Sequence, residues 1–394
     1  MRGAILDLLL GSRPKAIAAA AAVESSRSWP AVVNACREWR VLLRLNRRLG
    51  EFQIHLPPET RANFRQAASE AFLRTSRRLE RGAAALELLS RASIPCAGFK
   101  GVASAAILCP GRTDRTVQDV DVLIRQADLR KALSELACNG YSPVISQPLD
   151  DYIAFVRNSP GFAGNEAIEL TDAQGASIDL HWRLGRLDTE ELLAGAEAVP
   201  LLGRRVPLLR APYCVTIAAH HALRNDFVPD EMIRDLLDFH DWLPWMETRG
   251  EVRSAIQIAK RNRVWEAVLG LAHLSAGFGE SRVPETFVAE ATRADLRSAA
   301  DLAELFRGQL DEGPLNSDLV YLFDAGSIRQ IVAGAASGWR RYRSYMKVFE
   351  QSNGRDPVNL RMRLKQLAVA IWRMPRKRWR LVRTLALAKS AGLR

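Results

Sequence analysis

The residues best suited to chemistry lie in a short acidic segment in the first half of the chain. Residues 114–125 read DRTVQDVDVLIR, so Asp119 and Asp121 stand within a run of valine, leucine and isoleucine. On a strand, residues two apart point to the same face, which places both carboxylates on one side while Val120 and Val122 face the core. Two close carboxylates do not both ionise cheaply unless a cation lies between them. A divalent metal ion is the simplest cation for this position.

A second alternating segment adds a third acid. Residues 167–182 read AIELTDAQGASIDLHW, which is typical of a β-hairpin with its turn at DAQG. In the second half of this segment, Ser177, Asp179 and His181 share one face. If this strand neighbours the first acidic strand, three carboxylates converge. Mg²⁺ takes carboxylate oxygens, keeps several waters and shares substrate phosphates, so the set favours Mg²⁺ or Mn²⁺ and nucleotide chemistry over zinc chemistry.

The turn before the first acidic strand, which reads FKGVAS, is suited to binding an anion. Gly101 would let the backbone approach a phosphate, and the helix that begins there offers unpaired N–H groups. Lys100 and Ser104 would add donors from their side chains. Arg115, just before the acidic strand, could meet a triphosphate. For Lys100 and Arg115 a surface cation is an equally good interpretation.

The periodicity of the surrounding elements predicts an α+β fold. Two helical patterns, residues 29–50 and 71–93, predict an N-terminal helical region over 1–93. From 94 to 210, the order strand, helix, strand, helix and hairpin predicts a small α/β core with a mixed sheet. The helical period then returns, which predicts a C-terminal helical region over 211–360 and a basic helical tail over 361–394.

Composition and charge narrow the class of protein. The 394 residues are 48% hydrophobic and 25% charged, as in folded soluble proteins. The five cysteines are scattered without metal-ligand spacing, so we expect reduced thiols. No apolar run reaches the roughly 18 residues of a transmembrane segment, and the first residues make a poor signal peptide, so we expect a cytoplasmic protein. Eleven Lys and Arg and no acid lie in residues 361–394, so most of the net charge of +12 belongs to the tail.

In combination, these motifs resemble a known family. The chain resembles uncharacterised bacterial nucleotidyltransferases of the DNA polymerase β superfamily. The resemblance is carried by the FKG turn before a helix, an arginine shortly before DVDVLI, a helix ending in NGY, the hairpin ending in IDLHWRL and a later HHALRND…IRDLLDF segment. The resemblance covers roughly residues 29–245. It implies a polymerase-β-like nucleotidyltransferase core, with Asp119 and Asp121 as metal ligands and Asp179 as the third acid.

One part of the motif set departs from that superfamily. The superfamily usually has Gly-Gly or Gly-Ser at the turn and a shorter gap to the first aspartate. Here Val102 follows Gly101, and the glycine lies 18 positions ahead of Asp119. The metal role of the acids is therefore better supported than the phosphate role of the turn.

The resemblance implies a metal-dependent reaction of the EC 2.7.7 type. A nucleoside monophosphate would pass from an NTP, such as ATP, to an acceptor, and pyrophosphate would leave. Asp119, Asp121 and Asp179 would hold one metal ion, the first two would hold a second, and Asp179 is also the candidate general base. The candidate nucleotide-binding residues are Lys100, Gly101, Ser104, Arg115 and His181.

Three alternatives stay open at this point. The acids could be solvated or paired with arginine. The chain could be a catalytically inactive nucleotide-binding regulatory module, although the intact set of three acids argues against lost turnover. The tail motif RMPRKRWRLVR could make the chain a nucleic-acid or membrane adaptor that binds an anionic partner. The acceptor could be a peptide, a protein, a small molecule or RNA.

We expect His220 and His221 to be core histidines.

Overall fold

The structure is a computed structural model that divides into two compact units. The first comprises residues 1–147 and 166–313, and the second comprises 148–165 and 314–394. The residues described are 2–110, 114–145, 148–150, 153, 167–184, 187–224, 229–278, 282–293, 295–297, 299, 300 and 303. The basic tail predicted over 361–394 therefore lies outside the described residues. The division into a core and three further parts stays a prediction.

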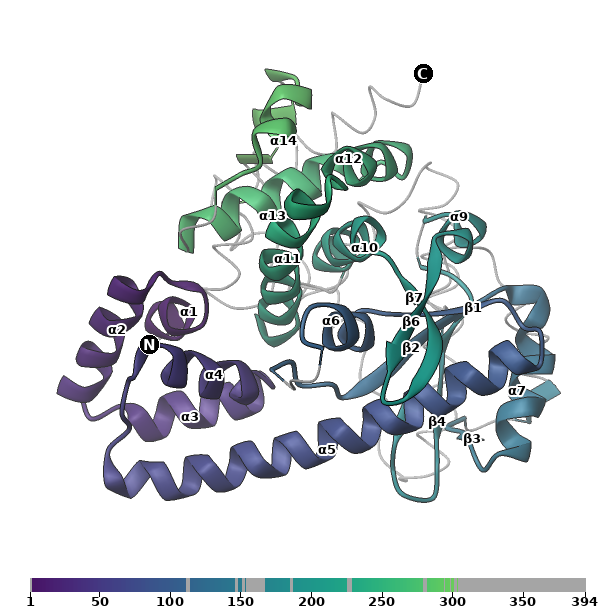
Figure 1. Ribbon diagram of the computed structural model, residues 1–394, viewed down its shortest axis with the longest axis horizontal. Helices are drawn as coiled ribbons and strands as arrows, with labels where there is room; N and C mark the ends of the chain where they lie inside the picture. The colour runs from purple at the N-terminus through teal and green to yellow at the C-terminus, as the bar shows by residue number, and fades with distance from the viewer. Residues whose placement is uncertain are drawn as a thin grey trace, which may run out of the picture. The chain divides into compact units, whose positions relative to one another are not determined.

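The first unit contains a seven-stranded mixed sheet in the order β3-β4-β5-β2-β1-β7-β6, and its strands gather at the right of Figure 1. Strand β2 pairs antiparallel with β1 and parallel with β5. The strands are β1 (Cys96–Phe99), β2 (Asp119–Ile124), β3 (Ser142–Pro143), β4 (Ala167–Thr171), β5 (Ser177–His181), β6 (Ala196–Leu201) and β7 (Arg204–Leu209). The mixed sheet expected from the sequence is confirmed, and the chain has the α+β class.

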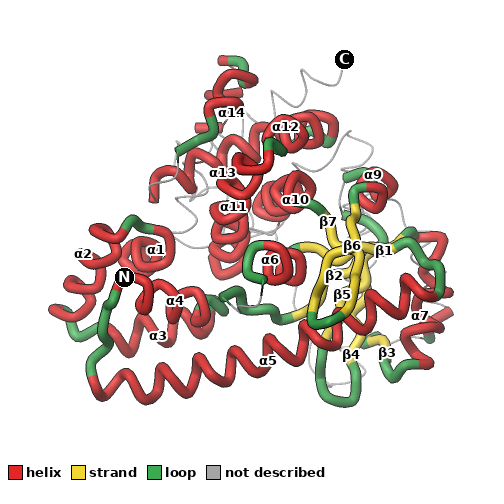
Figure 2. Tube along the Cα trace, viewed as in Figure 1, coloured by secondary structure: helices red, strands yellow, loops and turns green. Residues whose placement is uncertain are grey.

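Helices lie before, between and after the strands in the sequence, and Figure 2 shows them around the gathered strands. The helices before the sheet are α1 (Arg2–Leu10), α2 (Arg13–Ser25), α3 (Trp29–Glu38), α4 (Leu42–Phe52) and α5 (Pro58–Arg91). Those between strands are α6 (Gly101–Ile107), α7 (Leu129–Cys138) and α9 (Thr189–Ala194). Those after the sheet are α10 (Ala211–Arg224), α11 (Pro229–Arg249), α12 (Val252–Arg261), α13 (Trp265–Phe278) and α14 (Glu285–Glu290).

The first predicted helical pattern is interrupted in the structure. Helix α3 ends at Glu38 and α4 begins at Leu42, because Arg40 adopts the left-handed conformation with φ +61°. A non-glycine residue seldom adopts this conformation, so the apolar spacing alone did not reveal the break. The second pattern, by contrast, extends further toward the N-terminus and forms the 34-residue helix α5.

The hairpin of β4 and β5 forms because its turn is satisfied locally. Asp172 Oδ1 accepts hydrogen bonds from the backbone N–H groups of Gln174 and Ala176, each at 2.9 Å. Gly175 has φ +74°, a conformation that glycine adopts at no steric cost. The turn fixes the register of the two strands and therefore decides which side chains of β5 share a face.

Helix α5 packs closely on the sheet at β2. A Cβ atom at Gly82 would lie 2.4 Å from the side chain of Val120, so only glycine fits this position. Slightly earlier on α5, Thr75 Oγ1 accepts a hydrogen bond from the backbone N–H of Val117, and Arg78 Nη1 donates one to the Val117 carbonyl, both at 3.3 Å. Helix α5 therefore holds the start of β2 in place.

Three of the aspartates of helix α11, Asp235, Asp238 and Asp241, are spaced three residues apart on one side of the helix. Asp241 forms a two-pronged ion pair with Arg44 of α4, in which Arg44 Nη2 lies 2.9 Å from Asp241 Oδ1. Asp238 forms a second two-pronged pair with Arg115, with distances of 2.7 and 2.9 Å. One helix thus binds both the N-terminal helices and the segment that leads into β2.

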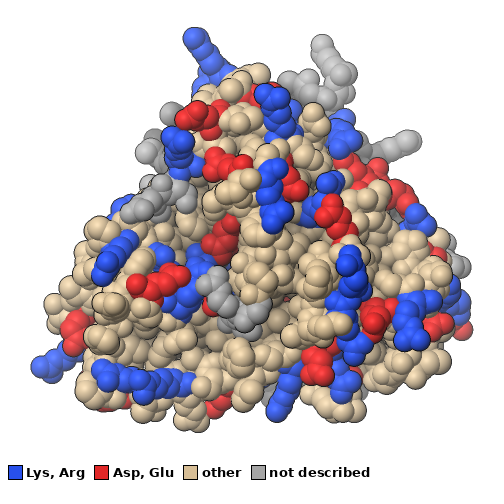
Figure 3. Space-filling view, in the orientation of Figure 1, with Lys and Arg blue, Asp and Glu red and all other residues tan. Residues whose placement is uncertain are grey.

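The charges of the described surface are mixed. Figure 3 shows lysine and arginine interspersed with acidic side chains on the face in view, without a single basic patch. This agrees with a body that is nearly neutral outside the tail. Within the part of the chain that the structure describes, no helix combines the length and the apolar character needed to cross a bilayer.

We predict that Asp241→Asn destabilises the protein by about 3 kcal/mol, because it leaves the buried Arg44 guanidinium without its anion. The matched control is Glu190→Gln, which breaks a pair with Arg125 whose side chains are 63% and 43% exposed. Such an exposed pair contributes little to stability, because water already solvates both charges. Urea unfolding of both variants measures the difference, and equal midpoints would contradict the structural role of Asp241.

Candidate functional site

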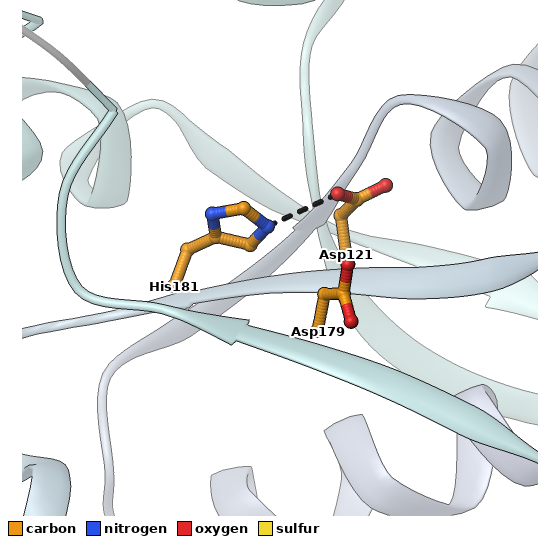
Figure 4. A group of neighbouring side chains, drawn as sticks. All are labelled: Asp121, Asp179 and His181. Carbon is orange, nitrogen blue, oxygen red and sulfur yellow. Dashed lines mark hydrogen bonds and ion pairs between the residues drawn. The ribbon is translucent and has the colours of Figure 1, made fainter. Parts of the chain in front are cut away.

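The register of the sheet brings the predicted acids together. Strands β2 and β5 are neighbours, and Asp121 lies opposite Asp179 while Asp119 lies opposite Ser177. Residues opposite one another on paired strands point to the same face. Figure 4 shows the Asp121 and Asp179 carboxylates and the His181 ring on one face of the two strands. The predicted adjacency of the two acidic strands is confirmed.

Asp121, Asp179 and His181 form a tight cluster. Each offers a potential ligand atom, and these atoms all lie within 4.8 Å of one another. Asp121 is buried, whereas Asp179 and His181 are half-buried. Asp119 is half-buried at the start of β2 and does not belong to this group. The cluster therefore contains His181, which the sequence analysis had assigned to nucleotide binding, alongside two of the three predicted acids.

The His181 ring is held in a fixed orientation. Its Nε2 atom lies 3.1 Å from Asp121 Oδ1, and because an ionised carboxylate can only accept, Nε2 donates this hydrogen bond. The Phe99 ring meets the imidazole edge-on, with centroids 5.1 Å apart. His181 is therefore placed to orient the Asp121 carboxylate or to offer a ligand atom itself.

Lys100 supplies the cation nearest to Asp121. Its Nζ atom lies 2.8 Å from Asp121 Oδ1, the same oxygen that His181 contacts. Burial by itself raises the pKa of Asp121, but the Lys100 ammonium and the His181 hydrogen bond outweigh burial and hold that pKa well below its usual range. Asp121 is therefore ionised at every physiological pH.

Asp179 has the opposite electrostatic character. Burial, followed by the negative charges of Asp121 and Asp119, raises its pKa to about 7, although the Lys100 ammonium opposes the rise. One ammonium therefore does not neutralise the carboxylates gathered here. The part of this rise that comes from the neighbouring carboxylates is repulsion, which one further positive charge, a proton or a metal ion, would relieve.

The backbone of Lys100 is strained. Its φ of +52° and ψ of −125° lie in a region that residues other than glycine rarely adopt. Lys100 directly precedes α6, so this conformation directs the chain from β1 into the helix. The sequence analysis assigned the Lys100 ammonium to a phosphate, and the structure places it on Asp121.

The other residues of the turn have simpler surroundings. A Cβ atom at Gly101 would lie 3.6 Å from Val117, an ordinary contact, so sterics alone do not require glycine there. Ser104 is buried, and within the described residues its Oγ atom has no hydrogen-bond partner. Their roles in phosphate binding stay predictions.

Arg115 is already paired in the structure. Its guanidinium binds Asp238 through two hydrogen bonds and also donates to the Thr116 carbonyl at 2.8 Å. The negative charges of Asp238, Asp235 and Asp119 more than offset burial and raise the pKa of Arg115. Arg115 therefore positions the segment that enters β2, and its contact with a nucleotide stays a prediction.

The sequence analysis missed the acids of α11 that border the cluster. Asp235 Oδ2 lies 2.7 Å from His221 Nδ1, and its negative charge helps to raise the pKa of Lys100. His220 is buried, as expected of a core histidine, but His221 is half-buried and paired. The signal was available in the segment IRDLLDFHD, where acids recur every three residues between large apolar ones.

A comparison with protein families gives one match. Residues 25–279 match the family described as uncharacterised nucleotidyltransferase, a span that holds β1 to β7 and the Asp121–Asp179–His181 cluster. A comparison with curated proteins found no match. The family match encloses the region, roughly residues 29–245, over which the sequence motifs carried the resemblance. Because the match covers more than half of the chain, the protein belongs to this family of nucleotidyltransferases.

Proposed function

We propose that the protein transfers a nucleoside monophosphate from an NTP to an acceptor hydroxyl on a polymerase-β-like core. In this reaction the acceptor oxygen forms a bond to the α-phosphorus, the bond between that phosphorus and the bridging oxygen breaks, and pyrophosphate leaves. The observation that carries the proposal is the pairing of Asp121 with Asp179 on neighbouring strands, with more negative charge than Lys100 neutralises.

The residues of the cluster fit a divalent metal ion. Two carboxylates within reach of one point are the donor set that Mg²⁺ or Mn²⁺ prefers, and the repulsion between them contributes to the raised pKa of Asp179. When bound, the ion would polarise the phosphoryl oxygens and lower the pKa of the acceptor hydroxyl. Asp121 and Asp179 would hold it, and Asp119 at the start of β2 is the proposed further ligand.

His181 supports the Asp121 carboxylate in this proposal. A ligand carboxylate is commonly oriented by a hydrogen bond from a neighbouring residue, and His181 Nε2 makes such a bond to Asp121. The edge-on contact with Phe99 limits rotation of the ring. His181 therefore keeps Asp121 facing Asp179, whether or not the imidazole is itself a ligand.

Asp179 is the proposed proton acceptor. A general base must lie within reach of the hydroxyl that it deprotonates, and Asp179 lies opposite Asp121 on the neighbouring strand, within the proposed metal site. Asp121 cannot take this role, because its pKa is held well below the usual range. The two acids differ in environment, and this difference assigns charge stabilisation to Asp121 and proton transfer to Asp179.

A non-catalytic nucleotide-binding module is the second candidate function. It would keep the fold and the Asp121–Lys100 pair without turnover. The experiments below separate the two functions, because binding and transfer are measured independently. An adaptor role for the basic tail falls outside the described residues.

We predict that Mg²⁺ and a non-hydrolysable NTP raise the melting temperature of the parent protein, because ligands that bind only the folded state stabilise it. Asp121→Asn and Asp119→Asn should each remove most of this rise. Glu190→Gln, an exposed charge removal of the same kind, is the control and should keep it. If the Asp121 and Asp119 variants shift as the parent does, the metal assignment is wrong.

We predict that metal binding releases a proton from Asp179. In the metal-free protein, the raised pKa means that protonated Asp179 stabilises the fold fully below about pH 4 and loses this contribution as pH rises through about 7. A divalent ion competes with that proton, so metal affinity should increase as pH rises to about 7 and then level off. Calorimetry in buffers of different ionisation enthalpy measures the released proton, and Asp179→Asn should abolish it.

We predict that Asp179→Asn lowers nucleotide transfer by at least about 100-fold while NTP still binds, because the variant loses the proton acceptor but keeps Asp121. Transfer of label from an α-labelled NTP to RNA, protein and small-molecule acceptors measures the rate. Calorimetry with a non-hydrolysable NTP checks binding. Transfer at the parental rate would remove Asp179 from the mechanism, and its absence in the parent with every acceptor class would favour the non-catalytic module.

A further inference from the structure

We propose that Lys100 is an exchangeable cation that couples nucleotide binding to metal binding. Its ammonium holds Asp121 in the metal-free protein, and it moves to a phosphate oxygen when metal and nucleotide enter together. This inference rests on the proposed function, because it concerns the same metal and nucleotide. It adds that the metal ion and the nucleotide each bind weakly without the other, and that the Lys100 side chain causes this dependence.

The position of the ammonium is the first observation. Lys100 Nζ lies 2.8 Å from Asp121 Oδ1, and the side chains of Lys100 and Asp121 are 23% and 5% exposed. Asp119 and Asp235 are the other anions that act on this ammonium. The contact therefore places a positive charge on one of the atoms that would bind the metal, inside a largely buried cluster.

The sharing of one oxygen is the second observation. Asp121 Oδ1 already receives both Lys100 Nζ and His181 Nε2. A carboxylate oxygen has few lone pairs, so a metal ion at Oδ1 must displace one of these donors. Since an ammonium and a divalent cation on the same oxygen repel each other strongly, Lys100 is the donor that leaves.

The displaced ammonium then needs a new anion. A buried charge without a partner is costly, so metal binding alone would leave Lys100 in an unfavourable state. Asp235 cannot easily replace Asp121, because it is already bound to His221. A nucleotide phosphate delivered with the metal supplies the missing anion and removes the cost.

The backbone explains why the side chain reaches both positions. The strained turn at Lys100 lies between β1 and α6, where a nucleotide phosphate is expected, and it directs the side chain toward β2. Such strain persists where the surroundings enforce it. A glycine would adopt this conformation without strain but would provide no ammonium.

The test measures Mn²⁺ binding at pH 8 by the electron paramagnetic resonance signal of the free ion, with and without a non-hydrolysable NTP. In the parent, we expect the nucleotide to tighten Mn²⁺ binding at least tenfold. In Lys100→Met and Lys100→Gln, we expect Mn²⁺ alone to bind at least tenfold tighter than in the parent, and the nucleotide to add little. Lys100→Gln keeps a hydrogen-bond donor for Asp121, so it carries the test if the methionine variant does not fold.

The control is Lys131→Met, which removes an exposed ammonium that donates a hydrogen bond to the Ala92 carbonyl at 2.6 Å. It should change neither affinity nor coupling. Parental Mn²⁺ affinity in both Lys100 variants, or no coupling in the parent, would overturn the role of Lys100 and leave the proposed function standing. A parent that binds no Mn²⁺ even with nucleotide would overturn the proposed function and this inference together.

Discussion

The parallel register of β2 and β5 sets Asp121 directly opposite Asp179. The other groups of the site offset the repulsion between these two carboxylates. Lys100 and His181 both contact the same oxygen of Asp121. Asp179 responds by holding a proton up to about pH 7. A shift of either strand by one residue would turn one acid into the core, so the register of the sheet is itself a functional property.

Contacts with residues that flank the acids in the sequence support this register. Gly82 lets α5 approach Val120, and Thr75 and Arg78 of the same helix bind the backbone of Val117 just before β2. From the other direction, Asp238 of α11 binds Arg115. Helices that precede and follow the sheet in the sequence thus hold Arg115 and Val117, which lead into Asp119.

Local patterns in the sequence predicted those parts of the site that depend only on neighbouring residues, such as strand alternation and tight turns. The two-residue alternation around Asp119, Asp121 and Asp179 requires only a few neighbouring residues, and so does the turn at Gly175. The sequence could not predict that Lys100 binds Asp121, because a left-handed lysine backbone leaves no periodic signal. It also did not predict the pair of Arg44 and Asp241, whose partners are 197 residues apart. The acids that recur every three residues in α11 did indicate that some cation must pair with them.

The pair between Arg44 and Asp241 also bears on how the chain can be divided. Cutting at residue 93, where the sequence pattern changes from helical to α/β, would separate Asp241 from its cation and remove the part of α5 that supports Val117. A fragment that begins at β1 would therefore contain every acid of the cluster without the framework that aligns them. A fragment that keeps the cluster together with its framework must therefore start before α4, and a fusion at the N-terminus should join the chain ahead of that helix.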